Sequence, residues 1–296
     1  MKRQQFLQGL LALTATSLAS ESLGGYTSPG FYRPGLKTSL NAYSFNDLLV
    51  KGKITLDELL EFCAARQFDA IDITGYYFKG YPAVPADDII YNFKRKAHRL
   101  GLGISGTGVR NDFTHADPAV RKAHVETVKA WTEVAAKLGA PVLRIFTGLA
   151  YPPQNERRQY TEIVAEHISQ CLESAKSHGV IIAIQNHHDF IRTGDEVIEL
   201  LKLIDSPWLG LVLDIGSYHG ANPYEDIRKT IPYAVNWQIK EKMFVNDKEQ
   251  LTDLKKIFDL IKASAYRGYL PIETLGAGDP FKKVPLFLNA VKKAMI

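Results

Sequence analysis

The sequence contains few cysteines, little excess charge and no hydrophobic run long enough to span a membrane. Cys63 and Cys171 are the only cysteines among 296 residues, which leaves room for one disulfide at most. Two unpaired thiols in helix packing are the favoured interpretation. The formal net charge of +4 is mild and no basic stripe occurs, which argues against a nucleic-acid partner. Short-period repeats and low-complexity tracts are also missing.

The N-terminus has the pattern of an export signal. Lys2 and Arg3 form a basic start, a short apolar stretch follows, and Ser17-Leu18-Ala19 fits a cleavage site. The apolar stretch is too short for a bilayer of about 30 Å. Residues 1–19 are therefore predicted to be an export signal peptide, which implies a periplasmic or otherwise exported protein without a membrane span in its mature chain. An amphipathic or disordered N-terminus is the alternative. Residues 20–36, rich in Gly, Ser, Tyr and Pro, are predicted to be a linker or an N-terminal arm.

From residue 37 to 296, eight short apolar segments alternate with eight helical patterns. The strands are predicted to begin near residues 38, 69, 103, 141, 180, 209, 234 and 268. Two capping boxes, which start at Thr55 and Thr193, mark helix starts. Eight alternations over about 260 residues predict a single-domain α/β fold, the (β/α)8 TIM barrel. A doubly wound open sheet is the rival, but residues 41–45 lack the glycine-rich phosphate turn that such a sheet often has after its first strand.

Four predicted strands end in polar side chains. Gln185 follows the fifth strand, Asp214 the sixth, Gln238 the seventh and Glu273 the eighth. Barrel enzymes carry their reacting groups at the carboxyl ends of the strands, so these four side chains are predicted to share one pocket. Lys240 shares its strand face with Gln238 and is expected in the same place.

Further strand ends offer groups that could bind or react with a substrate. His187 has the same parity as Gln185 and should face the pocket, whereas His188 should face away. Arg144 lies within an apolar strand, where it either pairs with a carboxylate such as Asp72 or Glu273 or binds substrate oxygen. The predicted substrate-binding residues are Asn41, Arg144, Ser217, His219 and Trp237.

Three motifs carry a resemblance to a known family. They are Gln-Asn-His-His-Asp-Phe at 185–190, Trp-Gln-Ile-Lys-Glu at 237–241 and Glu-Thr-Leu-Gly at 273–276. With them the chain resembles the xylose-isomerase-like superfamily of sugar isomerases and epimerases, in a branch found among exported bacterial proteins. The resemblance implies one divalent ion held by Glu, Asp, His and Glu at the ends of strands five to eight. Here Gln185 and Gln238 replace the first and third of these ligands.

Because Gln185 and Gln238 replace two ligands, two hypotheses remain for the source of positive charge in the pocket. In one, Gln185, Asp214, Gln238 and Glu273 hold a divalent metal ion, and oxygen ligands favour Mn²⁺, Mg²⁺ or Ca²⁺. In the other, no metal is bound and Lys240 supplies the positive charge beside the two carboxylates.

Removal of a proton next to a sugar carbonyl is the chemistry that the resemblance implies. Glu273 is the predicted base, His187 the predicted acid and Lys240 the predicted contact to substrate or oxyanion. The substrate is expected to be a free sugar or sugar derivative, and the oligomeric state stays open. A lyase or hydratase that acts on keto-glycosides by β-elimination is the alternative enzyme. A non-catalytic sugar-binding barrel is the alternative without turnover.

Overall fold

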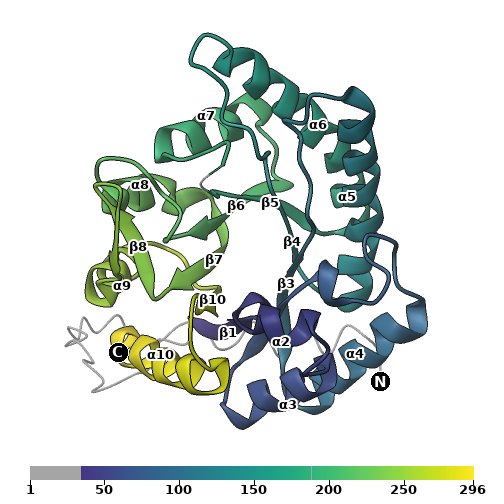
Figure 1. Ribbon diagram of the computed structural model, residues 1–296, viewed down its shortest axis with the longest axis vertical. Coiled ribbons are helices and arrows are strands. Elements are labelled where there is room, and N and C mark those ends of the chain that lie inside the picture. The colour runs from purple at the N-terminus through teal and green to yellow at the C-terminus, as the bar shows by residue number, and fades with distance from the viewer. Residues whose placement is uncertain (1–34, 188) are drawn as a thin grey trace, which may run out of the picture. The chain divides into compact units, whose positions relative to one another are not determined.

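Eight parallel strands close into a barrel that is surrounded by helices (Figure 1). The computed structural model describes residues 35–187 and 189–296. The predicted export signal and most of the predicted linker lie outside these residues. The strand order around the barrel is β1-β2-β3-β4-β5-β6-β7-β10, which closes on β1. The predicted (β/α)8 barrel is therefore confirmed.

The barrel strands are short and almost wholly buried, as expected where helices cover the outer face. Most of them are rich in Val, Ile and Leu, although β1 and β3 contain only one such residue each, and every strand starts within one residue of its predicted position. The strands are β1 Lys37–Asn41, β2 Ala70–Thr74, β3 Gly103–Gly108, β4 Val142–Ile145, β5 Ile181–Gln185, β6 Leu209–Asp214, β7 Ala234–Lys240 and β10 Tyr269–Glu273.

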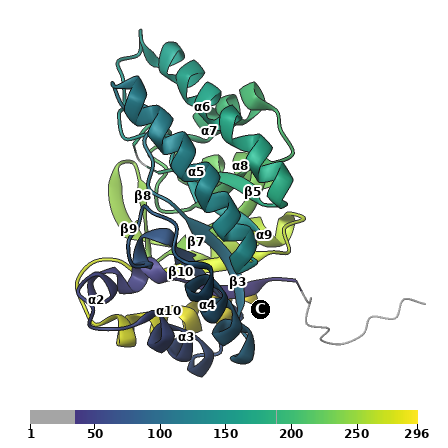
Figure 2. The ribbon, with the colours of Figure 1, turned by 90° about the vertical axis from the view of Figure 1, so that its right-hand side faces the viewer.

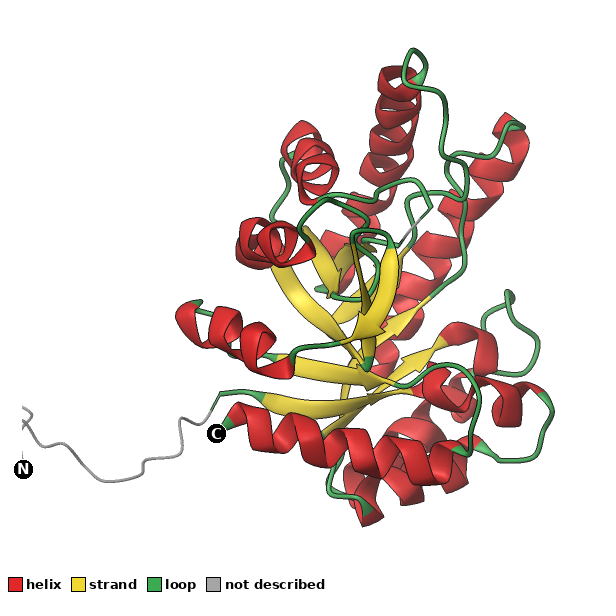
Figure 3. Ribbon diagram, turned by 60° about the vertical axis from the view of Figure 1, so that its left-hand side comes forward, coloured by secondary structure: helices red, strands yellow, loops and turns green. Residues whose placement is uncertain are grey.

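The helices lie outside the strands, as the red and yellow ribbons of Figure 3 show. Thr55 and Thr193 cap α3 and α7, and both capping boxes are formed. None of the helices in the described residues is both long and apolar enough to cross a membrane. The α-helices are α2 Asn46–Val50, α3 Leu56–Ala65, α4 Asp87–Arg99, α5 Pro118–Leu138, α6 Arg157–His178, α7 Gly194–Ile204, α8 Pro223–Thr230, α9 Leu254–Ala263 and α10 Pro280–Met295. The 3₁₀ helices are η1 Ala42–Phe45, η2 Gly75–Tyr77 and η3 Ile231–Tyr233.

A small hairpin, β8 (Lys242–Val245) and β9 (Lys248–Leu251), follows β7 and was not predicted. Figure 2 shows it at the same end of the barrel as α2, which is the end where the strands finish. Asn246 and Asp247 form its two-residue turn with φ of 51° and 56°. These left-handed conformations match the twist of a hairpin and suit Asn and Asp.

The barrel interior is polar just below the end where the strands finish. Asn236 on β7 donates to Asp72 Oδ2 on β2 at 3.1 Å, and the hydroxyls of Ser39 and Ser105 are 2.7 Å apart. All four side chains are buried. Cys63 and Cys171 are buried free thiols, so the favoured interpretation of the cysteines holds.

Candidate active site

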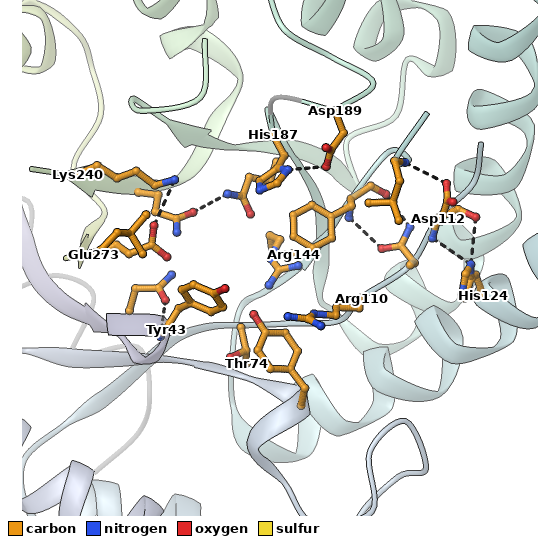
Figure 4. Close-up of a pocket in the computed structure, with 18 residues that line it drawn as sticks. Tyr43, Thr74, Arg110, Asp112, His124, Arg144, His187, Asp189, Lys240 and Glu273 are labelled. Carbon is orange, nitrogen blue, oxygen red and sulfur yellow. Dashed lines mark hydrogen bonds and ion pairs between the residues drawn. The ribbon is translucent and has the colours of Figure 1, made fainter. Parts of the chain in front are cut away.

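A cavity of about 530 Å³ opens at the carboxyl ends of the strands (Figure 4). Seven of the predicted site residues line it, namely Asn41, Arg144, Gln185, His187, Gln238, Lys240 and Glu273. Asp214 lies directly beneath Lys240 and is fully buried. The rest of the lining consists of Tyr43, Thr74, Tyr76, Arg110, Asn111, Asp112, His124, Phe146, Leu149, Asp189 and Leu275.

The ammonium group of Lys240 lies between the two predicted carboxylates. Its Nζ is 2.8 Å from Asp214 Oδ2 and 3.2 Å from Glu273 Oε2. The alternation of β7 turns Lys240 to the same face as Gln238. Gly216 gives the lysine stem its room, because a Cβ there would lie 2.5 Å from Lys240 Cδ. The strand ends thus build a buried cluster of one cation and two anions.

Every oxygen of the Asp214 carboxylate is already engaged. Oδ2 accepts from Gln185 Nε2, from Ser217 Oγ and from Lys240 Nζ, each at 2.8 Å. Oδ1 accepts from the backbone N of Gly216 at 2.9 Å. Gln185 Nε2 also donates to Gln238 Oε1 at 2.7 Å. The predicted first, second and third metal ligands therefore bind one another.

Burial and charge pull the pKa values of this cluster apart. Burial raises the pKa of Glu273 above its usual value, although Lys240 partly offsets this effect. Burial acts in the same direction on Asp214, but the charge and hydrogen bond of Lys240 outweigh it and lower the pKa of Asp214. Burial alone would lower the pKa of Lys240, yet the two carboxylates raise it. The lysine is held as a cation, and Glu273 is the better proton acceptor of the two acids.

This donor set does not fit a divalent ion. The amide nitrogen of Gln185 points toward Asp214, and an ammonium already bridges Asp214 and Glu273. A metal would need free oxygen lone pairs at the same place. Among residues 35–187 and 189–296, no three His, Cys, Asp or Glu side chains gather closely enough to hold a metal ion. The four predicted ligands meet as expected, but in the arrangement of the metal-free hypothesis.

His187 reaches the cavity from the tail of β5. Its Nδ1 is 2.6 Å from Asp189 Oδ2, and its ring packs edge-on against Phe146 with centroids 4.9 Å apart. A carboxylate at this nitrogen fixes the orientation of the imidazole. His188, which was predicted to face away, lies outside the described residues.

Within residues 35–187 and 189–296, Arg144 does not form the ion pair with a carboxylate that one of the two predictions proposed. Its Nη1 donates to the backbone O of Val109 at 2.7 Å, and its guanidinium lies 4.2 Å above the Phe146 ring. The Asp72 carboxylate accepts from Asn236 instead, and Glu273 pairs with Lys240. The prediction that Arg144 fixes one of these acids by a direct ion pair is therefore wrong.

Three predicted substrate contacts lie outside the cavity lining. Trp237 is fully buried and packs against Tyr266, because strand alternation turns it away from the face that carries Gln238. Ser217 is buried and donates to Asp214, so it supports the cluster from behind. His219 packs on Phe244 of the hairpin, 4.3 Å between ring centroids. The predicted direct roles of these three residues are not supported by their positions.

The roles of two site residues, Asp189 and Asn186, were not predicted from the sequence. Asp189 was not singled out, although it stands two places after His187 in the same motif. Asn186 was noted only as a strand-end amide, yet it ties β5 to β6. Its Nδ2 donates to Asp214 O and its Oδ1 accepts from Asp214 N, each at 2.8 Å. The contact of Asp189 with His187 could be predicted from their spacing of two residues. The contacts of Asn186 with Asp214 depend on the register between β5 and β6.

Comparisons with known proteins agree with this fold. A family model described as a xylose isomerase-like TIM barrel matches residues 60–291. An uncharacterized protein of Methanocaldococcus jannaschii is 31% identical over 134 residues, which are 41% of this chain and 45% of that protein. The aligned part thus spans less than half of that relative's length.

Two solved structures of sugar epimerases have the same fold. D-psicose 3-epimerase from Clostridium cellulolyticum H10 shares 14% identity with a TM-score of 0.72, over 88% of this chain and 99% of that one. 3-keto-D-glucoside 4-epimerase from E. coli shares 13% identity with a TM-score of 0.68, over 88% and 99%. The family model covers well over half of the sequence, and the chain therefore belongs to the xylose isomerase-like TIM barrel family.

Proposed function

We propose that the protein is an isomerase or epimerase of a sugar or sugar derivative that moves a proton next to a carbonyl group. The observation that carries the proposal is the placement of Glu273 and His187 in one cavity, on different strand ends, with a lysine ammonium against Glu273. The raised pKa of Glu273 suits a base that must hold a proton for part of the reaction. The epimerase activities of the two structural neighbours agree with this chemistry.

In the proposed reaction Glu273 takes the proton from the carbon next to the carbonyl. The electron pair of that C–H bond moves toward the carbonyl oxygen and forms an enediolate. Lys240, which stays protonated between its two carboxylates, stabilises the new negative charge. Gln185 cannot accept or give a proton, so the second proton transfer falls to another residue.

His187 is the proposed second group. In an epimerisation its imidazolium gives a proton to the opposite face of the same carbon. In an isomerisation Glu273 returns its own proton to the former carbonyl carbon. The hydroxyl proton of the adjacent carbon passes to the former carbonyl oxygen at the same time, and His187 is the proposed carrier of this proton between the two oxygens. Asp189 acts through His187 as a positioning residue, because it holds Nδ1.

Proton NMR in deuterated buffer tests the proposal. Incubation with a panel of ketoses, aldoses and 3-keto-glucosides should place solvent deuterium at a carbon next to the carbonyl of at least one substrate. Glu273→Gln should abolish the exchange. Glu241→Gln is the matched control, since Glu241 pairs with Lys283 at 3.2 Å and is not part of the cavity lining.

Other outcomes would assign the pocket differently. Loss of water or of an aglycone without deuterium at a retained carbon would identify the lyase or hydratase. Sugar binding that survives Glu273→Gln, with no exchange by the wild-type protein on any member of the panel, would identify a non-catalytic binding barrel. Either result would overturn the isomerase or epimerase proposal.

A further inference from the structure

Arg144 is a buried cation at the cavity without an ion-pair partner among the described residues. The residue is 8% exposed, and the hydrogen bond that its side chain makes within the described part of the chain goes from Nη1 to the backbone O of Val109. A guanidinium group in a buried place normally pairs with a carboxylate, because the loss of water around its charge is costly. Arg144 faces the cavity, so a bound ligand can supply the missing anion.

The strands leave a shaped space for this guanidinium. Gly108 on β3 is the register neighbour of Arg144 on β4. A Cβ at Gly108 would lie 2.8 Å from Arg144 Cζ and 2.8 Å from its Nε. On the other side the guanidinium stacks 4.2 Å above the Phe146 ring. The space left by Gly108 and the face of the Phe146 ring thus fix the orientation of the planar Arg144 guanidinium.

Arg110 adds a second positive charge on the same side of the cavity. Its guanidinium lies 4.8 Å above the Tyr76 ring. Burial raises the pKa of the Tyr81 hydroxyl, and the positive charges of Arg144 and Arg110 both offset part of this rise. Both arginines therefore lie near the Tyr81 hydroxyl. Figure 4 shows the two guanidinium groups away from Lys240 and Glu273.

The opposite side of the cavity has the reverse charge. There one lysine is shared by the carboxylates of Asp214 and Glu273, which leaves a net negative cluster. Burial raises the pKa of Asp72 to about 6, and the nearby charge of Arg144 offsets part of this rise, but the Asp72 oxygen accepts from Asn236 rather than from the arginine. An anionic group on a ligand would be drawn to the arginines and repelled from the lysine cluster.

We propose that the cavity takes a sugar that carries an anionic group, with Arg144 binding this group through its planar fork and Arg110 as the second cation. Two parallel N–H donors match the oxygens of a carboxylate or of a phosphate. The anion at the arginines would direct the other end of the sugar to Glu273 and Lys240. This orientation rests on the proposed function, whereas the anion site itself does not.

Calorimetry with the Glu273→Gln protein tests the site without turnover. The ligands are three hexuronates (glucuronate, galacturonate and mannuronate), the matching neutral hexoses and the matching hexose 6-phosphates. At least one anionic sugar should bind tenfold or more tightly than its neutral partner, and this preference should shrink as salt is added. A preference for the uronate or for the 6-phosphate identifies the anion as a carboxylate or a phosphate.

Substitutions then locate the site. Arg144→Gln should remove the preference for the anionic sugar. Gly108→Ala should weaken the preference by displacing the guanidinium. Arg110→Gln, at an exposed position, should weaken it in a protein whose fold is not at risk. Equal affinity for charged and neutral sugars throughout the panel, or no binding at all, would overturn the proposal.

The deuterium experiment separates this inference from the proposed function. Exchange on neutral sugars without an anion preference would leave the function standing and remove the anion site. An anion preference that depends on Arg144, without exchange on any sugar, would do the reverse.

Discussion

Replacement of Lys240 by Met is the sharpest test of the charge arrangement in the cavity. Met keeps a similar stem and removes only the ammonium that lies 2.8 Å from Asp214 and 3.2 Å from Glu273. These carboxylates are 0% and 3% exposed, so water from the cavity can make up for the lost charge only in part. Removal of one partner from a buried ion pair typically costs about 3–5 kcal/mol in the free energy of unfolding.

The cost should depend on pH in a definite direction. Burial already raises the pKa of Glu273, and Lys240 acts against that rise, so the variant should have a still higher pKa at Glu273. A raised folded-state pKa adds stability below the unfolded pKa, and this stability is lost as pH rises through the folded value. Lys240→Met should therefore be least destabilised near pH 5 and most destabilised near pH 8. Urea unfolding at both pH values measures the difference.

The same variant should acquire a response to metal. Without the ammonium, the two negatively charged carboxylates of Asp214 and Glu273 have no cation between them. If Mn²⁺ binds there with a Kd of about 10 µM, about 1 mM Mn²⁺ adds about 2.7 kcal/mol to the stability of the variant. The wild-type protein should not respond, and a chelator should leave its stability and activity unchanged.

Lys242→Met is the matched control for this experiment. Lys242 pairs with Glu249 on the exposed hairpin, so its loss should cost about 1 kcal/mol or less at either pH, with no response to Mn²⁺. The reasoning fails if wild type and Lys240→Met gain equal stability from Mn²⁺. It also fails if Lys240→Met unfolds with the same free energy as the control.

Three further substitutions test the surroundings of the cluster. Burial raises the pKa of Asp72 from 3.8 to about 6, so the stability that its protonated carboxyl contributes is fully present below pH 4 and is lost as pH rises through 6. In Asp72→Asn the amide oxygen still accepts from Asn236 and does not ionise. The free energy of unfolding of this variant should therefore gain about 3 kcal/mol relative to wild type between pH 4 and pH 7, as urea titrations would show. Asn186→Ala should cost about 1–3 kcal/mol and lower kcat, because it removes one hydrogen bond from the buried N of Asp214 and one from its O, which keeps only the longer bond from Ser217 N at 3.4 Å. Unchanged unfolding would contradict this. Trp237→Phe should lower the stability by about 1–3 kcal/mol and leave KM unchanged, since the ring packs outside the cavity, and a raised KM would restore Trp237 as a substrate contact.

The barrel itself was predictable because its signals are local. Continuous apolar runs gave the strands, and side-chain hydrogen bonds at Thr55 and Thr193 gave helix starts. The period of two along a strand placed Lys240 with Gln238 and His187 with Gln185 on the cavity side. The hairpin after β7 had a signal too, in Asn246-Asp247, but the segment was not assigned to strands.

The remaining features depend on how strands pair and were out of reach. Asn236 meets Asp72 across the barrel, and the pairing of β2 with β3 and of β6 with β7 includes a shift of register. A one-residue shift changes which side chains are opposite, and no local pattern reports it. The same parity that placed Lys240 correctly would have excluded Trp237, had it been applied to every residue of β7.

The two glutamines and the lysine are best understood as one unit. A glutamate at position 185 would bring a third carboxylate against Asp214, and a single ammonium could not balance three buried negative charges. The amide nitrogen of Gln185 instead donates to Asp214 Oδ2 and to Gln238 Oε1, two oxygens that a metal would otherwise take. Lys240 fits only with neutral side chains at these two positions. The full ligand set of Glu, Asp, His and Glu would therefore require changes at Gln185, Gln238 and Lys240 together, whereas Lys240→Met alone leaves a weaker site made of the Asp214 and Glu273 carboxylates. Each of these changes made alone should destabilise the fold.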